Sequence, residues 1–550
     1  MIEARGSAAT RLRLSLPAIL MVIGFAAMLQ LLCTIRGGLF EDTAVAWDEA
    51  LRLYAGQLPY RDFAGASGPL AGFVAWIFLV LSGGHLGVAI VFLSVCANVA
   101  AAFLVQWLVW RATADIILSV VAGLFTGGWY LTMLGGWYYD HAAYLCVLGA
   151  AALWLLDAPI YSKHIAIGVL LGLSFWFKQT TGTFASVAFG LAYLSDVPFS
   201  ALRRGPFWAM VAAAACAFGA ILAVLLMVSD HELLLKYFVT LPAAYSNATK
   251  DYSRLFIMFV TPYFLNPIAA IRGHHLGDLN MYLMVLLIYA SYAVVLWRRH
   301  MLRERSPLRF ALVFLFVSTF LCVPMVGRLL THLIWGLGGI FAIVVFLAFP
   351  EDARLRARAG FAVLLYSLLF WAPHIWVDRL QRPGVDVAAG WSSAIWPVSI
   401  NSGRFAYDRP GQALALADIA RRLKDTDCHF ALYDDSARLV ALLAGRAPEN
   451  LVIAPQEIIA VPIDPQGRAA WEREEIMHLK ARRTDVVIVT FESVTRRFRV
   501  EHSTPLGFES LQIFQDFFDT DYRRVAMPDG IDVYVLPDSP CAMRLASNPG

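Results

Sequence analysis

The chain has 550 residues, of which 59% are hydrophobic and only 15% are charged, and its formal net charge is +3. Soluble proteins average about 25% charged residues, so this composition predicts that much of the chain lies in lipid. The small net charge gives no indication of a nucleic-acid partner.

Apolar runs of membrane-spanning length begin directly after an arginine-bearing N-terminus. The first run, from about residue 14 to 35, is too long for the apolar part of a signal peptide, so we interpret it as a retained first span. Later spans are predicted at roughly 85–110, 115–134, 138–157, 164–178, 180–196, 207–229, 280–298, 308–326, 329–349 and 359–377. The predicted fold class is therefore an α-helical polytopic membrane protein with about eleven spans.

Lysine and arginine in the short connections predict the orientation of these spans. With the N-terminus in the cytoplasm, alternate connections are basic, at Arg111, Lys163 with His164, Arg203 with Arg204, the stretch 298–309, and Arg354, Arg356 and Arg358. This alternation places residues 37–84, 230–279 and everything after about 378 outside. We predict a transmembrane domain over residues 1–378, in a bacterial inner membrane because the alanine- and arginine-rich usage fits a GC-rich genome.

The first external loop, residues 37–84, gathers acidic and basic side chains at the membrane surface. These are Glu41, Asp42, Asp48, Glu49, Arg52 and Arg61. A carboxylate there can act as general base on an acceptor hydroxyl or amine that attacks a sugar. We choose Asp48 for this role and Glu49 second. The alternative interpretation is that the acids only solvate an exposed loop.

After this cluster, residues 68–81 form a short apolar stretch that fits a helix lying in the membrane interface better than a full span. Three motifs of the loop together resemble the first external loop of GT-C class glycosyltransferases, namely Asp48-Glu49-Ala50-x-Arg52, Gly56-x-x-Pro59-Tyr60-Arg61-Asp62-Phe63 and Gly68-Pro69-Leu70. That class includes protein O-mannosyltransferases, the aminoarabinose transferase of lipid A and bacterial enzymes that use polyprenyl-phosphate sugars.

The resemblance implies that Asp48 and Glu49 are the catalytic element. It further implies a polyprenyl-phosphate-linked sugar as donor and a single inverting displacement that needs no metal and no cofactor. Arg61 would help to hold the donor phosphate, and Tyr60 and Asp62 are further site candidates because they belong to the same motif.

Two other pairs fall on the predicted outer face. Asp140 and His141 begin a span, where ionisable residues are functional candidates, although an aromatic belt at headgroup level explains them as well. Lys178 and Gln179 lie between two short spans, and such a lysine can bind the carrier phosphate or simply snorkel to the interface. The resembling bacterial enzymes often carry a Lys-Gln pair here.

A third pair is Arg328 and His332, four residues apart at the outer ends of two spans. On a helix they share one face, so both can point at a phosphate. A Gly-Arg followed closely by His recurs in the same bacterial enzymes, whereas the alternative is a structural ion pair. The donor-phosphate set predicted from sequence is therefore Lys178, Arg328, His332 and Arg61.

Residues 379–550 differ from the preceding apolar part of the chain, because charged residues become more frequent and alternating apolar stretches appear. Strands are predicted near 429–433 and 486–489, helices near 411–424 and 436–445, and a hairpin over 522–536. We predict an extracytoplasmic soluble α/β domain. The seven cysteines form no CxxC pattern, which argues against metal or redox chemistry. Cys428 and Cys541 can pair in an oxidising compartment, but we expect both to be ordinary residues.

The predicted function is a membrane glycosyltransferase acting outside the cytoplasm. The acceptor stays open between lipid A, a surface polysaccharide, another lipid and a protein. Three other classes also stay open. A transporter or flippase of lipid-linked glycans usually shows hydropathy repeats and broken helices, which are not evident here. A non-catalytic envelope assembly protein is compatible with the sequence. A ligase or polymerase of lipid-pyrophosphate-linked glycans fits less well with the early Asp-Glu pair.

Overall fold

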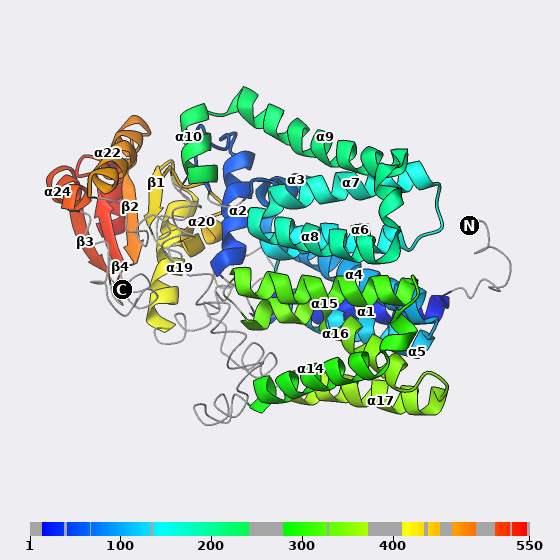
Figure 1. The fold of residues 1–550 in the computed structure, drawn as a ribbon. Helices are drawn as coiled ribbons and strands as arrows, with labels where there is room; N and C mark the ends of the chain where they lie inside the picture. The colour runs from blue at the N-terminus through cyan, green and yellow to red at the C-terminus, as the bar shows by residue number, and fades with distance from the viewer. Residues whose placement is uncertain are drawn as a thin grey trace.

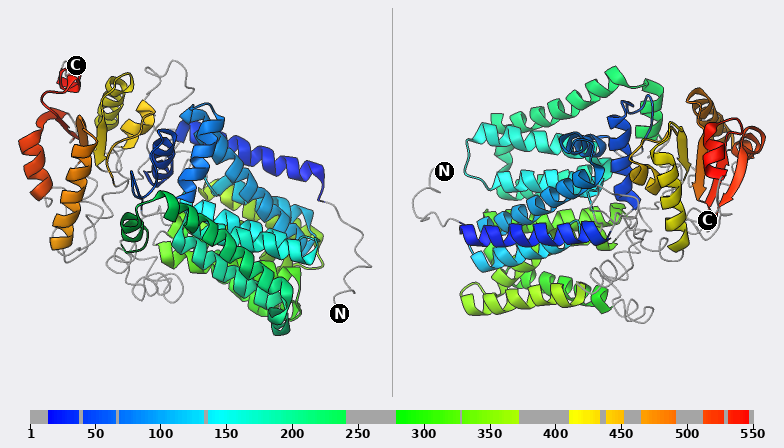
Figure 2. Two further views of the ribbon diagram at one scale, coloured as in Figure 1. Left: turned by 90° about the horizontal axis from the view of Figure 1, so that it is seen from above. Right: turned by 180° about the vertical axis from the view of Figure 1, so that it is seen from behind.

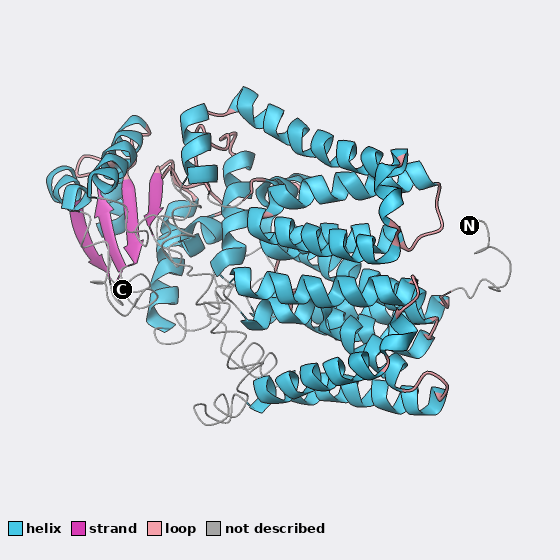
Figure 3. Ribbon diagram, viewed as in Figure 1, coloured by secondary structure: helices cyan, strands magenta, loops and turns pink. Residues whose placement is uncertain are grey.

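The structure is a computed structural model of the chain. It describes residues 14–37, 41–65, 68–132, 136–240, 279–326, 329–371, 410–433, 438–451, 465–490, 512–527 and 531–546. Helices make up one body, and the strands lie together at one end of it (Figures 1 and 3).

The long helices run side by side in a bundle (Figures 1 and 2). They are α1 (Leu16–Gly37), α4 (Leu86–Thr113), α5 (Ile116–Trp129), α6 (Tyr139–Trp154), α7 (Ile160–Phe177), α8 (Gln179–Asp196), α9 (Gly205–Val228), α14 (Leu279–Trp297), α15 (Pro307–Val326), α16 (Leu329–Ala348) and α17 (Ala353–Tyr366). A helix thus lies at each position where the sequence predicts a span. Short helical turns η2 (Phe199–Arg203), η3 (Lys236–Thr240), η6 (Arg299–Leu302) and η7 (Ser367–Trp371) join or extend them.

Four segments of the described helices are long and apolar enough to cross a membrane. They are Leu16–Thr34, Leu86–Thr113, Ile160–Phe177 and Gly205–Val228. Several other described helices are apolar but shorter by this measure. The protein is therefore a membrane protein, whereas the number of crossings stays a prediction.

Small residues bring the bundle helices into close contact. Gly168 and Gly172 lie one turn apart on α7, and a β-carbon added at either would lie 2.1 Å or 2.5 Å from backbone oxygens of α9. Such small-xxx-small pairs allow close backbone approach in membranes, where dispersion rather than the hydrophobic effect drives helix association. Polar side chains are also used, since the buried Asn98 amide donates to the backbone oxygens of Ala26 and Gly127 at 3.2 and 2.8 Å.

Helix α2 (Glu41–Tyr54) lies across one end of the bundle, between the long helices and the strands (Figures 1 and 2). Helix α3 (Leu70–Leu81) follows it and packs against it, and α10 (His231–Leu235) lies at the same end. A backbone hydrogen bond joins the start of α10 to the segment between α2 and α3, because Asp230 N donates to Tyr60 O at 2.9 Å.

The strands form one mixed sheet in the order β1-β2-β4-β3. Their bounds are Phe430–Tyr433 (β1), Val486–Thr490 (β2), Arg523–Met527 (β3) and Ile531–Val535 (β4). β1 pairs parallel with β2, whereas β2 with β4 and β3 with β4 are antiparallel. The accompanying helices are α19 (Pro410–Lys424), α20 (Arg438–Ala444), α22 (Pro465–Ala481), α24 (Gln512–Asp521) and α25 (Pro540–Ala546). The four strands, α19 and α20 lie where the sequence predicts strands and helices, whereas α22, α24 and α25 were not predicted.

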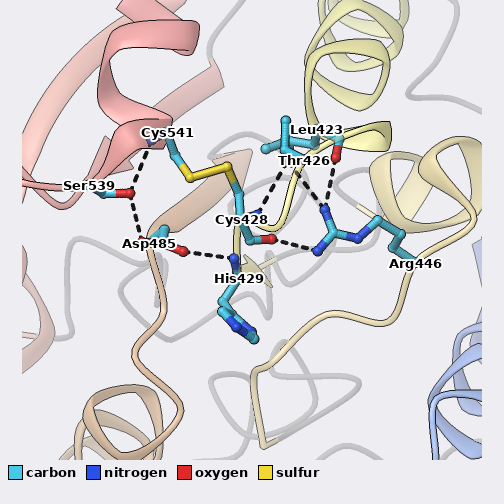
Figure 4. The surroundings of a disulfide bond; sticks show 8 residues. All are labelled: Leu423, Thr426, Cys428, His429, Arg446, Asp485, Ser539 and Cys541. Carbon is cyan, nitrogen blue, oxygen red and sulfur yellow. Dashed lines mark hydrogen bonds between the residues drawn. A yellow bond between two sulfur atoms is a disulfide. The ribbon is translucent and has the colours of Figure 1, made fainter.

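A disulfide joins Cys428, just before β1, to Cys541 in α25 (Figure 4). The expectation that both are ordinary residues is therefore wrong, because the fold brings together two cysteines that are 113 residues apart in sequence. Arg446 reinforces the Cys428 side by donating to Leu423 O and Cys428 O, both at 2.8 Å. The disulfide thus ties the start of β1 to α25.

Candidate active site

The acidic pair of α2 is buried. Asp48 is 2% exposed and Glu49 is 4% exposed, while Arg52, one turn further along, is fully buried. Arg52 Nε lies 3.0 Å from Asp48 Oδ1. The alternative that Asp48 and Glu49 only solvate an exposed loop is therefore wrong, because both side chains are buried. A buried charge is costly unless it is paired, and Arg52 supplies the partner of Asp48.

The other nitrogens of Arg52 bond to a residue almost four hundred positions later. Arg52 Nη1 donates to Asn450 O at 2.7 Å, and Nη2 donates to Asn450 Oδ1 at 3.2 Å. The guanidinium also lies over the ring of Phe63, 5.5 Å from its centroid. Arg52 therefore links α2 to the end of the segment that follows α20.

Glu49 lies in a site that disfavours its ionised form. Burial, reinforced by the neighbouring Asp48 charge, raises the pKa of Glu49 from 4.5 to about 8, although Arg52 and Arg438 act in the opposite direction. Helix α3 packs directly on this side chain, since a β-carbon added at Gly72 would lie 2.4 Å from Glu49 Oε2. Two adjacent carboxyl groups in different surroundings are a recurring arrangement for dividing acid and base roles.

The Glu49→Gln variant is expected to lose part of the pH dependence of stability. Between pH 4.5 and about 8 the unfolded chain ionises Glu49 while the folded chain keeps the proton, so this group lowers stability as pH rises. Thermal unfolding midpoints in detergent should therefore fall more steeply from pH 5 to pH 8 for wild type than for Glu49→Gln. The exposed Glu232→Gln serves as control and should follow wild type. If the unfolding midpoints of Glu49→Gln and wild type fall equally steeply with pH, the raised pKa of Glu49 is contradicted.

The motif residues Tyr60, Arg61 and Asp62 form a turn beside the acidic pair. Asp62 Oδ2 accepts from Leu58 N at 2.8 Å and from Arg61 Nη2 at 2.9 Å, and Arg482 Nη2 reaches Asp62 Oδ1 at 2.5 Å. Burial raises the pKa of the Asp62 carboxyl, but these donors outweigh it and hold the pKa below its usual value. Asp62 thus links this turn to Arg482, the residue that directly follows α22.

Within the turn, Tyr60 and Arg61 differ in exposure. The Tyr60 ring is buried, its hydroxyl donates to Gly65 O at 3.2 Å, and its backbone has a φ of 56°. A non-glycine residue with positive φ is uncommon and needs surrounding structure to hold it. The Arg61 side chain is 54% exposed and pairs with Asp62 at the surface.

The start of α3 connects the acidic pair to the junction between α7 and α8. A β-carbon at Gly68 would lie 1.9 Å from Trp176 O, so only glycine fits there without movement. Trp137 Nε1 donates to Ala71 O at 3.1 Å, and the Trp137 ring packs against Phe177 at 5.9 Å. The first loop therefore meets two segments singled out from the sequence, 137–141 and 177–179.

Lys178 lies at the break between α7 and α8, where its extended backbone ends one helix and begins the next. Its Nζ is 4.3 Å from the ring centroid of Tyr139, a cation–π contact. Gln179 opens α8, and its Nε2 is buried. Cation, amide and helix N-terminus thus lie together, a combination that favours an anion.

Asp140 and His141 are both buried at the start of α6. Asp140 Oδ1 accepts a hydrogen bond from the Thr181 hydroxyl in α8. His141 packs edge-on against the Tyr130 ring at 4.9 Å, and the Tyr130 hydroxyl donates to His141 O at 2.5 Å. These contacts join α6 to α5 and α8 beside Lys178.

The side chains of two of the predicted phosphate-binding residues lie outside the described part of the structure. Arg328 lies outside the described residues, and for His332, which is in α16, the side chain is outside the described part. Among the described residues, no group of three His, Cys, Asp or Glu side chains is arranged to hold a metal ion.

Sequence reasoning missed Asn450, Arg438 and Thr181 as neighbours of the candidate site. The helical spacing of Asp48 and Arg52 already indicates their ion pair, because residues four apart share a helix face. No signal in a single sequence pairs Arg52 with Asn450 or Glu49 with Arg438. Those contacts depend on how the strand region, meaning the described residues from 410 to 546 with β1–β4 and their helices, packs against α2.

No protein-family model matches the sequence, and no curated protein matches it by sequence. Several solved structures resemble it in fold, among them the following two. One is an oligosaccharyltransferase of Archaeoglobus fulgidus tethered to an acceptor peptide containing the NVT sequon, with a TM-score of 0.50, 13% identity, and coverage of 94% of this chain and 74% of that one. The other is ArnT of Cupriavidus metallidurans in the apo state, with a TM-score of 0.50, 12% identity, and coverage of 94% and 97%. Both are GT-C glycosyltransferases, so the chain has the GT-C fold, as the resemblance of its first loop implied.

Proposed function

We propose that this protein is a membrane glycosyltransferase that moves a sugar from a polyprenyl-phosphate carrier to an acceptor in a single inverting, metal-independent displacement. The observation that carries the proposal is the buried Asp48–Glu49 pair, held by Arg52 on a helix across one end of a GT-C bundle. The raised pKa of Glu49 is typical of a catalytic site, which favours an enzyme over a non-catalytic assembly protein.

Asp48 is the proposed general base. It takes the proton of an acceptor hydroxyl or amine while that oxygen or nitrogen forms a bond to the anomeric carbon of the sugar. The bond between that carbon and the phosphate oxygen breaks, and the electron pair leaves with the carrier phosphate. Arg52 orients Asp48 by its bond to Oδ1, which leaves Oδ2 for the acceptor.

The departing phosphate gains negative charge and needs cationic or polar donors. Lys178 is the proposed phosphate ligand, supported by the adjacent N-terminus of α8 and the Gln179 amide. Arg328, His332 and Arg61 are proposed to contribute as well. Of these, Arg61 would first have to leave its surface pair with Asp62, which costs little because exposed ion pairs are weak.

The chemistry is proposed to face the non-cytoplasmic side of a bacterial inner membrane, with about eleven spans and residues 379–550 outside. The Cys428–Cys541 disulfide supports this orientation, because disulfides persist in oxidising compartments and are rare in the cytosol. The acceptor is a glycan, a lipid or a protein, and the strand region beside α2 is suited to take part in choosing it.

A binding measurement tests the donor class. Purified protein is titrated with a panel of polyprenyl-phosphate sugars, comparing wild type with Lys178→Ala and with Lys163→Ala. Both lysines lie at ends of α7 and over an aromatic ring, Lys163 Nζ being 4.9 Å from the Trp154 centroid. We expect Lys178→Ala to weaken binding by about tenfold or more, the value of one charge-assisted contact, and Lys163→Ala to bind like wild type. Absence of binding to every donor would contradict the proposal.

A further inference from the structure

The strand region is linked to Asp48 through Asn450 and Arg52. We infer that Asn450 is a positioning residue for Asp48, acting through Arg52. This inference rests on the proposed function for its meaning in catalysis, but the contact itself is independent of any substrate.

The guanidinium of Arg52 is held on two sides at once. Its Nε bonds Asp48 Oδ1 at 3.0 Å, whereas Nη1 and Nη2 bond the backbone oxygen and Oδ1 of Asn450 at 2.7 and 3.2 Å. Because a guanidinium is planar, the two bonds from Nη1 and Nη2 fix the direction in which the Nε–H points. Asn450 therefore sets the direction from which Arg52 approaches Asp48.

Asn450 is itself fixed within the strand region. It is 1% exposed, and its Oδ1 also accepts from Leu432 N of β1 at 3.2 Å. The next residue, Leu451, donates from its N to Glu475 Oε1 at 2.9 Å and accepts at its O from Ala64 N at 2.6 Å. The segment is thus anchored to the sheet, to α22 and to the first loop.

Loss of the Asn450 side chain leaves Arg52 Nη2 and Leu432 N without their shared acceptor, whereas the bond from Nη1 to the Asn450 backbone oxygen remains. A buried unsatisfied donor is costly, so we expect the Arg52 guanidinium to shift toward another oxygen and its bond with Asp48 to change. A displacement of about 1 Å at a catalytic group costs about a hundredfold in rate, without removing any group that binds substrate. The expected signature is a fall in kcat with little change in KM.

Two substitutions separate positioning from folding. Asn450→Leu removes the Oδ1 acceptor at similar volume, whereas Asn450→Asp keeps an oxygen for both Arg52 and Leu432 N. Tyr522→Phe is the matched control, because it removes a different buried hydrogen bond of the strand region, that from the Tyr522 hydroxyl to Thr484 O at 2.8 Å.

We expect kcat to fall about tenfold to a hundredfold in Asn450→Leu, with KM for the donor within about twofold, and to be largely restored in Asn450→Asp. Tyr522→Phe should keep the wild-type kcat. An unchanged kcat in Asn450→Leu, or an equal fall in Asn450→Asp, would overturn the inference.

A second measurement needs no substrate and so separates this inference from the proposed function. Thermal unfolding midpoints of Asn450→Leu, Arg52→Met and the double variant form a double-mutant cycle, which is expected to be strongly non-additive because the two side chains share their bonds. Additive shifts would overturn the inference even if the protein transfers sugar. Non-additive shifts with a wild type that transfers no sugar would instead reject the proposed function and leave the contact in place.

Discussion

The Asp48→Asn variant is expected to transfer sugar about 10²- to 10⁴-fold more slowly than wild type, the range that a positioned general base contributes. Asparagine keeps an oxygen that can accept from Arg52 Nε, so the fold of α2 should survive. What it lacks is the ability to take a proton from the acceptor. The change should therefore appear in kcat, while KM for the donor stays near the wild-type value.

Initial rates of transfer in detergent or liposomes measure this effect. Asp157→Asn is the matched control, because the Asp157 side chain is 89% exposed and pairs with Arg111. It should transfer at the wild-type rate. If Asp48→Asn keeps full activity while Glu49→Gln loses it, the base is Glu49. If both keep full activity, the assignment of the catalytic element is wrong.

The Arg52→Met variant is expected to lose about 3–5 kcal/mol of stability, because it leaves the buried Asp48 carboxylate without its cation. Methionine has a comparable apolar length, so lost packing is a smaller part of the effect. We expect a markedly lower unfolding midpoint and little or no transfer activity. Thermal unfolding of the purified protein at pH 7 measures the midpoint, and the transfer assay measures the activity.

The double variant Asp48→Asn with Arg52→Met is the control for this mechanism. With the carboxylate gone, the missing cation matters less, so the unfolding midpoint should recover part of the difference while activity stays low. A wild-type midpoint in Arg52→Met would mean that the pair contributes nothing to stability. A double variant less stable than Arg52→Met would show that packing, not the unpaired charge, causes the loss.

Local signals in the sequence predicted most of the helices. Apolar runs of about 20 residues have few alternatives to a helix in lipid, because every backbone group must be bonded internally. The same reasoning found α3, since 12 apolar residues after Gly68-Pro69 are too short for a full span. Short apolar stretches at β1 and β2 likewise indicated strands.

The candidate site was found in sequence but its environment was not. Clustered charges after the first span pointed to Asp48 and Glu49, yet composition alone favoured the interpretation that these acids only solvate an exposed loop. Burial comes from Gly72, which lets α3 pack on Glu49, and from the strand region, which contributes Asn450 and Arg438. Such contacts depend on docking between distant segments, and one sequence carries no signal for them.

The cysteine pair illustrates the same limit. Two cysteines separated by 113 residues have no spacing that favours pairing, whereas the fold brings the start of β1 beside α25 and joins them. The break between α7 and α8 at Lys178 was predicted from the sequence, whereas the cation–π contact of Lys178 with Tyr139 was not, because it joins residues of different helices.

The most direct test of the proposed chemistry is transfer of a labelled sugar from a synthetic polyprenyl-phosphate donor by wild type and by Asp48→Asn. The assay uses the full-length protein in liposomes, with envelope lipids, glycans and proteins supplied as acceptors. We predict labelled product with wild type, with the sugar's anomeric configuration inverted, and a loss of about 10²-fold or more with Asp48→Asn. No labelled product from any donor and acceptor, or equal rates for the two proteins, would contradict it.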